Sequence, residues 1–162
     1  MEKKLRRAVR CFLIKENKVV VIKYKKGNIK EGYYDIPGGK IEDGEVAEQT
    51  AIREMKEETG IDIRNLKHKG FMTIEYPNRK FIFNTFITSD YVGEPREFEE
   101  NISEWIDIQK LLQKEKILSN IMILERLFIK GLIDDNYSFN LHIVVDEQEN
   151  ILNVNYNLEQ KD

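Results

Sequence analysis

Residues 39–61 read GKIEDGEVAEQTAIREMKEETGI and carry three glutamates at helical spacing. Glu54, Glu57 and Glu58 stand at i, i+3 and i+4, so they share one face of a helix. Each like-charged pair at this spacing costs about 0.2–0.5 kcal/mol, and partial burial raises that cost. A cation between the carboxylates would offset the repulsion, and oxygen ligands without His or Cys favour Mg²⁺ or Mn²⁺. Taken alone, the triplet also fits a solvated acidic surface.

The residues around the triplet predict a loop followed by a helix over 46–59. An apolar stripe recurs there at the helical period. It consists of Ala47, Ala51, Ile52 and Met55. Gly60 is placed to end the helix in a left-handed conformation. Before the helix, Pro37 favours an extended residue at position 36, and Gly38-Gly39 permits a tight backbone path that side chains would block.

With these residues in place, the sequence resembles the signature of the Nudix hydrolase family, G-x5-E-x7-R-E-U-x-E-E-x-G-U, in which U is apolar. Residues 39–61 match it at every position. The matching residues are Gly39, Glu45, Arg53, Glu54, Met55, Glu57, Glu58, Gly60 and Ile61. The resemblance extends from Lys4 to about Lys130. It implies an α+β fold, a Nudix-like α/β/α sandwich with a mixed central sheet, and Mg²⁺-dependent cleavage of a nucleoside diphosphate linked to another group.

The resemblance also implies which residues bind the metal ion. Glu54, Glu57 and Glu58 are expected to be its acidic ligands, and one of them is expected to activate water as well. A backbone carbonyl of Gly38 or Gly39 is expected to supply another ligand, which explains why a residue without a side chain is needed there. The expected ion is Mg²⁺, with Mn²⁺ as an alternative.

Other residues of the signature are expected to be structural. Glu45 and Arg53 resemble the family's ion pair that fixes the loop against the helix. Gly39 and Gly60 are expected to shape the backbone on either side of that helix. None of these four is expected to react with the substrate.

A further catalytic and metal-binding acid is expected from the loop that follows the central strands. Glu99 lies six residues ahead of Trp105, where MutT-type members of the family carry such a carboxylate. Glu97 and Glu100 compete for the same role, and a plain acidic loop is the alternative interpretation. Trp105 itself is expected to pack in the core rather than to stack on a base.

Basic and amide side chains are the candidates for substrate binding. Arg10, Lys23 and Lys25 could complete a phosphate cradle, or they could be solvated ends of strands. Asn120 lies fifteen residues after Trp105, at the start of the last expected helix, where MutT-type members place an Asn that contacts the base. Helix capping by Ser119 or Asn120 is the competing interpretation.

The substrate is open among several classes. The PGGK opening at 37–40 resembles MutT-type proteins, which suggests an oxidised nucleotide such as 8-oxo-dGTP, cleaved to the monophosphate and pyrophosphate. Pro77 stands where ADP-ribose-cleaving relatives often have a proline, but 77–79 also reads as a hairpin turn. Removal of diphosphate from RNA 5′ ends, cleavage of other nucleoside-diphosphate sugars, and a regulatory nucleotide-binding module are the remaining alternatives.

Composition limits the partners and the compartment. The chain has 162 residues and a net charge of −3, so no global basic field draws it to nucleic acid or membrane. No run approaches the roughly 18 apolar residues of a membrane span, and no signal peptide is recognised. The one cysteine, Cys11, lies in an apolar stretch and is expected to be a buried structural thiol. These features predict a cytoplasmic protein without a membrane partner or a stable nucleic-acid partner. The family resemblance implies that its partner is a small nucleotide substrate.

The remaining segments complete the expected fold. Strands are expected at 8–15, 19–24, 66–76, 80–91 and 104–108, and helices at 109–114 and 117–129. The tail at 139–156 alternates apolar and polar residues around a polar turn, which predicts a hairpin. We expect one domain over 1–162, with a core at about 4–130 and the C-terminal β-hairpin at about 136–158. That hairpin could cover the sheet edge, extend the core or form a homodimer.

Overall fold

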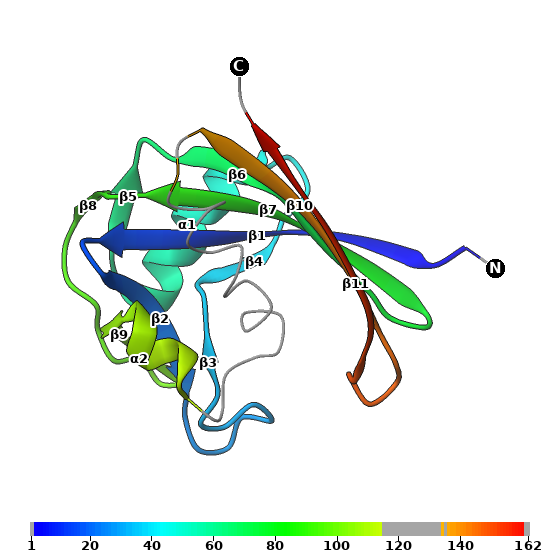
Figure 1. Ribbon diagram of the computed structural model, residues 1–162. Helices are drawn as coiled ribbons and strands as arrows, with labels where there is room; N and C mark the ends of the chain where they lie inside the picture. The colour runs from blue at the N-terminus through cyan, green and yellow to red at the C-terminus, as the bar shows by residue number, and fades with distance from the viewer. Residues whose placement is uncertain (1, 115–133, 135, 161–162) are drawn as a thin grey trace.

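The computed structural model describes residues 2–114, 134 and 136–160. Figure 1 shows a long twisted sheet with helix α1 behind it. The elements are β1 (Lys4–Lys15), β2 (Lys18–Tyr24), β3 (Tyr34–Asp35), β4 (Gly38–Lys40), α1 (Ala47–Thr59), β5 (Asp62–Arg64), β6 (Lys67–Glu75), β7 (Arg79–Thr88), β8 (Asp90–Val92), β9 (Asn101–Asp107), α2 (Ile108–Leu112), β10 (Tyr137–Val145) and β11 (Ile151–Gln160). The helix expected at 117–129, and Asn120 with it, lie outside the described residues.

The large sheet is mixed, as the sequence predicts. Its strand order is β11-β10-β6-β7-β1-β2-β3, with β4 paired to β1 and β9 paired to β2. Strand β1 runs parallel to β7, and β10 runs parallel to β6, whereas the other pairs in this sheet are antiparallel. The C-terminal hairpin therefore extends the central sheet through β6.

One glycine makes the approach of β10 to β6 possible. Gly70 has a φ of +136°, and it is the Cα partner of Phe139. A Cβ at position 70 would run into the carbonyl oxygen of Phe139. Only a residue without a side chain lets the two backbones come this close.

Helix α1 begins and ends close to where the sequence predicts. Val46 is extended (φ −93°, ψ 156°), and its N–H donates to the side chain of Gln49 at 3.2 Å. Gly60 ends the helix in the left-handed region (φ 82°), with its N–H donating to the Lys56 carbonyl at 2.9 Å. The helix therefore ends directly after the turn that carries Glu57 and Glu58.

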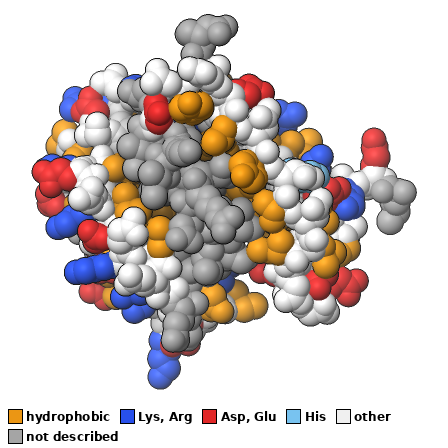
Figure 2. Space-filling view, viewed as in Figure 1, with side chains coloured by type: hydrophobic (Ala, Val, Ile, Leu, Met, Phe, Trp, Pro, Cys, Tyr) orange, Lys and Arg blue, Asp and Glu red, His pale blue; other side chains and the backbone are white. Residues whose placement is uncertain are grey.

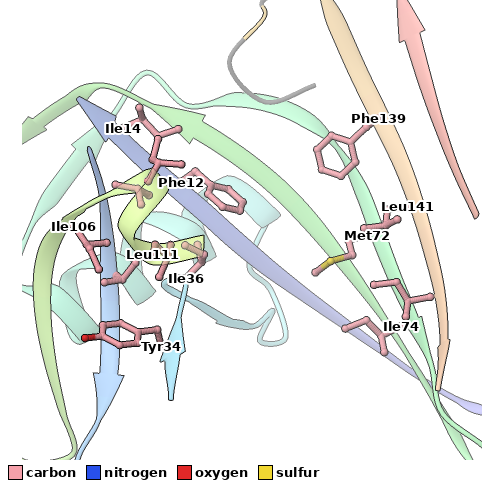
Figure 3. Packing of buried hydrophobic residues seen from close by; sticks show 14 of the residues in the cluster. Phe12, Ile14, Tyr34, Ile36, Met72, Ile74, Ile106, Leu111, Phe139 and Leu141 are labelled. Atoms are coloured by element: carbon pink, nitrogen blue, oxygen red, sulfur yellow. The ribbon is translucent and has the colours of Figure 1, made fainter. Parts of the chain in front are cut away.

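Alternate residues of β1 face two separate hydrophobic clusters. Val9, Cys11 and Leu13 pack with Ala51 and Met55 under α1, so the thiol is a buried core group, as expected. On the opposite face, a second cluster spans the sheet from β2 to β10. Figure 3 shows its members Phe12, Ile14, Tyr34, Ile36, Ile106, Leu111, Met72, Ile74, Phe139 and Leu141.

Several strand boundaries differ from the sequence prediction. Strand β1 starts at Lys4 rather than at residue 8, because its first four residues, which are largely exposed, also pair with β7. The strand expected over 80–91 is two strands, since Thr88 Oγ1 donates to the Arg64 carbonyl at 2.6 Å and accepts from Asp90 N at 3.1 Å. This turn redirects β8 to pair with β5 in a separate small sheet.

Strand β9 is longer and earlier than the expected 104–108. It begins at Asn101 and ends at Asp107, whose side chain accepts the N–H groups of Gln109 and Lys110 and so starts α2. Within the described part of the chain, no helix is long and apolar enough to cross a membrane.

Candidate functional site

The last two turns of α1 bring two glutamates against β4. The Glu58 Oε1 atom accepts a hydrogen bond from the Gly38 N–H at 2.9 Å. The Glu54 carboxylate lies against Gly39 so closely that a Cβ on that glycine would be 2.5 Å from both Cδ and Oε1 of Glu54. The glycine pair thus makes room for both acids where the strand meets the helix.

Arg53 connects the loop before the helix to the acidic face. Its Nε donates to Glu45 Oε2 at 2.8 Å, and its Nη2 donates to Glu45 Oε1 at 2.9 Å. Its Nη1 also donates to Glu54 at 2.9 Å and to Glu57 at 3.2 Å. The Arg53 hydrogen bond is the main reason that the pKa of Glu45 falls to about 2. The arginine therefore holds the loop and orients Glu54 and Glu57.

Burial makes two of the three helix carboxylates unfavourable as isolated charges. Desolvation raises the pKa of Glu58 to about 8, and the nearby charges of Glu54, Asp35 and Glu57 add to the rise, although the hydrogen bond from Gly38 opposes it. Desolvation also raises the pKa of Glu54, against the lowering effect of Arg53. Desolvated carboxylates that repel one another form a site that is stabilised when positive charge is bound.

The expected extra acid faces the same cleft. A cleft of about 390 Å³ is lined by Glu57 and Glu58 of α1, by Tyr24 of β2, and by Glu99 and Glu100 of the loop before β9. The third candidate behaves differently, because the exposed Glu97 forms an ion pair with Lys25 at 2.7 Å. Glu99 and Glu100 therefore remain the candidates for the further metal-binding acid. Lys25 forms its ion pair with Glu97.

The residues present fit a divalent cation, although they are not fully gathered around one point. In residues 2–114, 134 and 136–160, no three His, Cys, Asp or Glu side chains are grouped closely enough to hold an ion. Glu57 is paired with Arg53 near the surface, where the Glu57 side chain is 58% exposed against 17% for Glu54. The buried charge of Glu54 and Glu58, together with the space at Gly39, is the feature that suits a hard cation with oxygen ligands.

A second cavity lies on the other side of a buried ion pair. Arg10 Nη1 donates to Asp35 Oδ1 at 3.0 Å, and Tyr24 donates to Asp35 Oδ2 at 3.1 Å. Tyr24 lines the acidic cleft, whereas Arg10 lines a cavity of about 270 Å³ together with Tyr76 and Phe83. Asp35 therefore links the carboxylate site to an aromatic cavity.

Lys23 and Trp105 line neither the acidic cleft nor the aromatic cavity. Lys23 Nζ lies over the Tyr34 ring at 5.4 Å, and Lys23 lines neither of the two cavities. Trp105 packs beside the core under α1, with its ring 5.4 Å from that of Tyr91, so it is not a base-stacking platform at the acidic cleft.

Two features of the site could not be recognised from sequence reasoning. Asp35 is a single acid ahead of Pro37, and no spacing rule connects it to Arg10. The cavity residues Tyr76 and Arg79 flank the turn between β6 and β7. The sequence of this segment indicates a hairpin turn, but it does not indicate a cavity beside that turn. The alternation of apolar and polar residues along β6 and β7 does predict that each strand has one apolar face, and that the two apolar faces lie on the same side of the sheet.

The metal-free protein should lose stability as the pH rises through the titration of Glu58. The pKa of about 8 in the folded protein lies above the ordinary glutamate pKa of 4.5, so between these two values the folded state holds a proton that the unfolded chain has released. The stabilising effect of that proton is complete below about pH 4.5 and is lost as the pH passes about 8. In chelator, the thermal unfolding midpoint should fall over this interval, and Glu58→Gln should flatten the profile. An unchanged slope in the variant would show that Glu58 is not desolvated.

Comparison with known proteins identifies the family. A model described as the NUDIX domain matches residues 4–127. The chain belongs to the Nudix hydrolase family. It is a Nudix hydrolase acting on pyrophosphate bonds, and the family typically uses a divalent metal ion.

Nudix relatives match both the sequence and the fold. The uncharacterized Nudix hydrolase YvcI of Bacillus subtilis is 32% identical over 113 residues, which is 66% of this chain and 69% of that protein. The 8-oxo-dGTP diphosphatase of Proteus vulgaris is 30% identical over 93 residues, covering 57% of this chain and 83% of that one. The crystal structure of a MutT protein from Bacillus halodurans superimposes with a TM-score of 0.76 at 21% identity, over 95% of this chain and 97% of that chain. The α+β Nudix fold therefore includes the C-terminal strand pair β10–β11.

Proposed function

We propose that the protein hydrolyses a nucleoside triphosphate to the monophosphate and pyrophosphate, and that its preferred substrate is an oxidised purine nucleotide such as 8-oxo-dGTP. The observation that carries this proposal is the adjacency of two sites through Asp35. Glu58 and Glu54 lie beside Gly38 and Gly39 on one side, and an aromatic cavity that can hold a base lies on the other. The 8-oxo-dGTP diphosphatase among the relatives favours the oxidised purine.

The ligands of the metal ion are proposed from the same geometry. Glu54, Glu57 and Glu58, the carbonyl groups of Gly38 and Gly39, and Glu99 from the facing loop would hold Mg²⁺, or Mn²⁺ in its place. When bound, such an ion neutralises charge on the phosphate oxygens and lowers the pKa of bound water.

The side chains of this chain perform the remaining steps. Glu58 Oε1 is held by the Gly38 N–H, so the carboxylate keeps a fixed orientation toward the cleft, where it can accept the proton of the attacking water. Arg53 holds Glu54 and Glu57 on the helix face. Arg10 is paired with Asp35. In the bound substrate, it would lie between the diphosphate and the group attached to it.

The alternative substrates have less support. Pro77 lies in the turn between β6 and β7, where Tyr76 N donates to the Arg79 carbonyl at 2.9 Å. A turn explains this proline without an ADP-ribose substrate. A 5′-RNA substrate would favour a basic surface, and the net charge is −3. We keep both as outcomes of the experiment.

The test is a hydrolysis screen with Mg²⁺ that separates phosphate from pyrophosphate release. It should include 8-oxo-dGTP, the four ordinary dNTPs, ADP-ribose and 5′-triphosphorylated RNA. We expect pyrophosphate release and a higher kcat/KM for 8-oxo-dGTP than for dGTP. Preferential cleavage of ADP-ribose or RNA, or release of single phosphate, would contradict the proposal. We also place the protein in the cytoplasm, where the single buried thiol of Cys11 would stay reduced.

A further inference from the structure

The cavity beyond Asp35 is lined by Lys30, in the loop between β2 and β3, and by four further parts of the chain. Strand β1 supplies Arg10, β7 supplies Phe81 and Phe83, and Tyr76 follows β6. The fourth wall is the C-terminal hairpin, which contributes Ile143, Val145 and Glu149. Figure 1 shows that the turn of this hairpin and the turn between β6 and β7 lie at the same end of the sheet. The hairpin thus forms one side of the cavity.

The walls suit a flat ring. The rings of Phe81 and Phe83 are stacked, with centroids 6.0 Å apart, and Arg79 lies 4.5 Å above the Tyr76 ring. Ile143 and Val145 of β10 are buried and complete the apolar side. Figure 2 shows hydrophobic side chains gathered over the same hairpin on the face turned to the viewer. Aromatic and aliphatic walls around a few polar groups are typical of pockets for heterocycles.

Arg10 lines this cavity with a buried guanidinium group. The side chain is buried, with 6% of the residue exposed, and its guanidinium lies 4.6 Å from the centre of the Phe83 ring. Its Nη1 is bonded to Asp35, but Nε has no partner among the described residues. A guanidinium has five N–H donors, and leaving buried donors unpaired is costly. Asp35 takes up only one of the guanidinium nitrogens, so Arg10 can also donate to a group bound in the cavity that it lines.

Glu149 presents an acceptor on the hairpin wall. Its backbone is left-handed, with φ at +64°, a conformation that is uncommon for a glutamate. Asp146 fixes the turn by accepting the N–H groups of Gln148 and Asn150 at 2.9 and 2.8 Å. The carboxylate is close enough to Tyr76 to raise the pKa of its hydroxyl, whereas Arg79 and Arg10 lower it and burial is the largest cause of the rise. Donor and acceptor groups thus meet around one aromatic cavity.

We propose that Glu149 of the C-terminal hairpin is a specificity-determining residue, and that with Arg10 it selects a base in which a carbonyl group adjoins a ring N–H. The carbonyl accepts from Arg10 and the N–H donates to Glu149, while Tyr76 and Phe83 contact the ring. The inference rests on the proposed function, because it concerns the group attached to the diphosphate that the enzyme cleaves. A base with an amino group in place of the carbonyl presents a donor to Arg10, and it is disfavoured.

The test is Glu149→Gln, with Glu147→Gln as the matched control. Both residues are exposed in the same turn, but only Glu149 lines the cavity. We expect Glu149→Gln to raise KM for 8-oxo-dGTP and dGTP by about tenfold, with kcat unchanged, because a hydrogen bond to a charged group is replaced by a neutral one. The KM for dATP should change less than threefold, so the preference between the two bases should narrow. Calorimetric binding of dGMP without metal should weaken by the same factor.

Each other result overturns the inference. If the cavity holds a second anionic group, removing the Glu149 charge will lower KM. If KM is unchanged, or if Glu147→Gln has the same effect, the hairpin does not contact the base. Failure of the wild-type protein to cleave any nucleoside triphosphate contradicts the proposed function instead, so the two failures are distinguishable.

Discussion

Replacing Glu58 with glutamine is expected to lower kcat by at least about a thousandfold while the protein remains folded. Loss of a metal-binding or proton-accepting carboxylate at a hydrolytic centre removes about 10²–10⁴ in rate for the acid–base contribution alone. The amide oxygen of glutamine can still accept the Gly38 N–H, so the contact that orients the side chain is kept. The thermal unfolding midpoint should stay equal or rise, because a desolvated carboxylate is removed.

The matched control for this variant lies on the same helix. Glu48 is exposed in the first turn of α1, away from β4, so Glu48→Gln should leave both activity and stability unchanged. The measurements are steady-state kinetics with Mg²⁺ and a thermal melt of each variant. Near-normal hydrolysis by Glu58→Gln would remove this residue from the reaction.

Alanine at Gly39 is expected to slow hydrolysis strongly with little loss of stability. The new Cβ would lie 2.5 Å from the end of the flexible Glu54 side chain, which can move away. Its displacement removes one of the two buried carboxylates from the metal site, so we expect kcat/KM to fall by at least about a hundredfold and Mn²⁺ binding to weaken. Kinetics and a metal titration followed by calorimetry check both effects.

Its neighbour provides the contrast. A Cβ at Gly38 would meet the backbone carbonyl of Val9, which is held in the β1–β4 pairing and cannot rotate away. Gly38→Ala should therefore lower the unfolding midpoint as well as the activity. If Gly39→Ala is as unstable as Gly38→Ala, the loss of activity in Gly39→Ala cannot be assigned to Glu54.

The central helix and the signature that it contains could be predicted from local sequence patterns. The apolar stripe and Gly60 predicted α1 within one residue, because capping and amphipathic packing depend on neighbours in sequence. The signature spacing then placed Glu54 and Glu58 on a face that the structure turns toward Gly38 and Gly39. The mixed sheet was expected because strands and helices interleave along the chain without a regular βαβ order.

Contacts between segments that are distant in sequence could not be predicted from such local patterns. The Arg10–Asp35 pair depends on how β1 and β3 lie in the finished sheet, and the cavity depends on β10 pairing with β6. The break between β7 and β8 is set by one hydroxyl of Thr88 that bonds across to Arg64. No periodicity in a single sequence encodes such long-range partners.

The parallel pairing of β10 with β6 has a consequence for biosynthesis. The ribosome delivers Glu54 and Glu58 well before Phe139 can reach Gly70, and parallel pairing between remote segments forms slowly. Until then β6 presents an unpaired edge, which is a site of premature association. The ribosome therefore delivers the acidic residues of α1 before the C-terminal strands that complete the aromatic cavity.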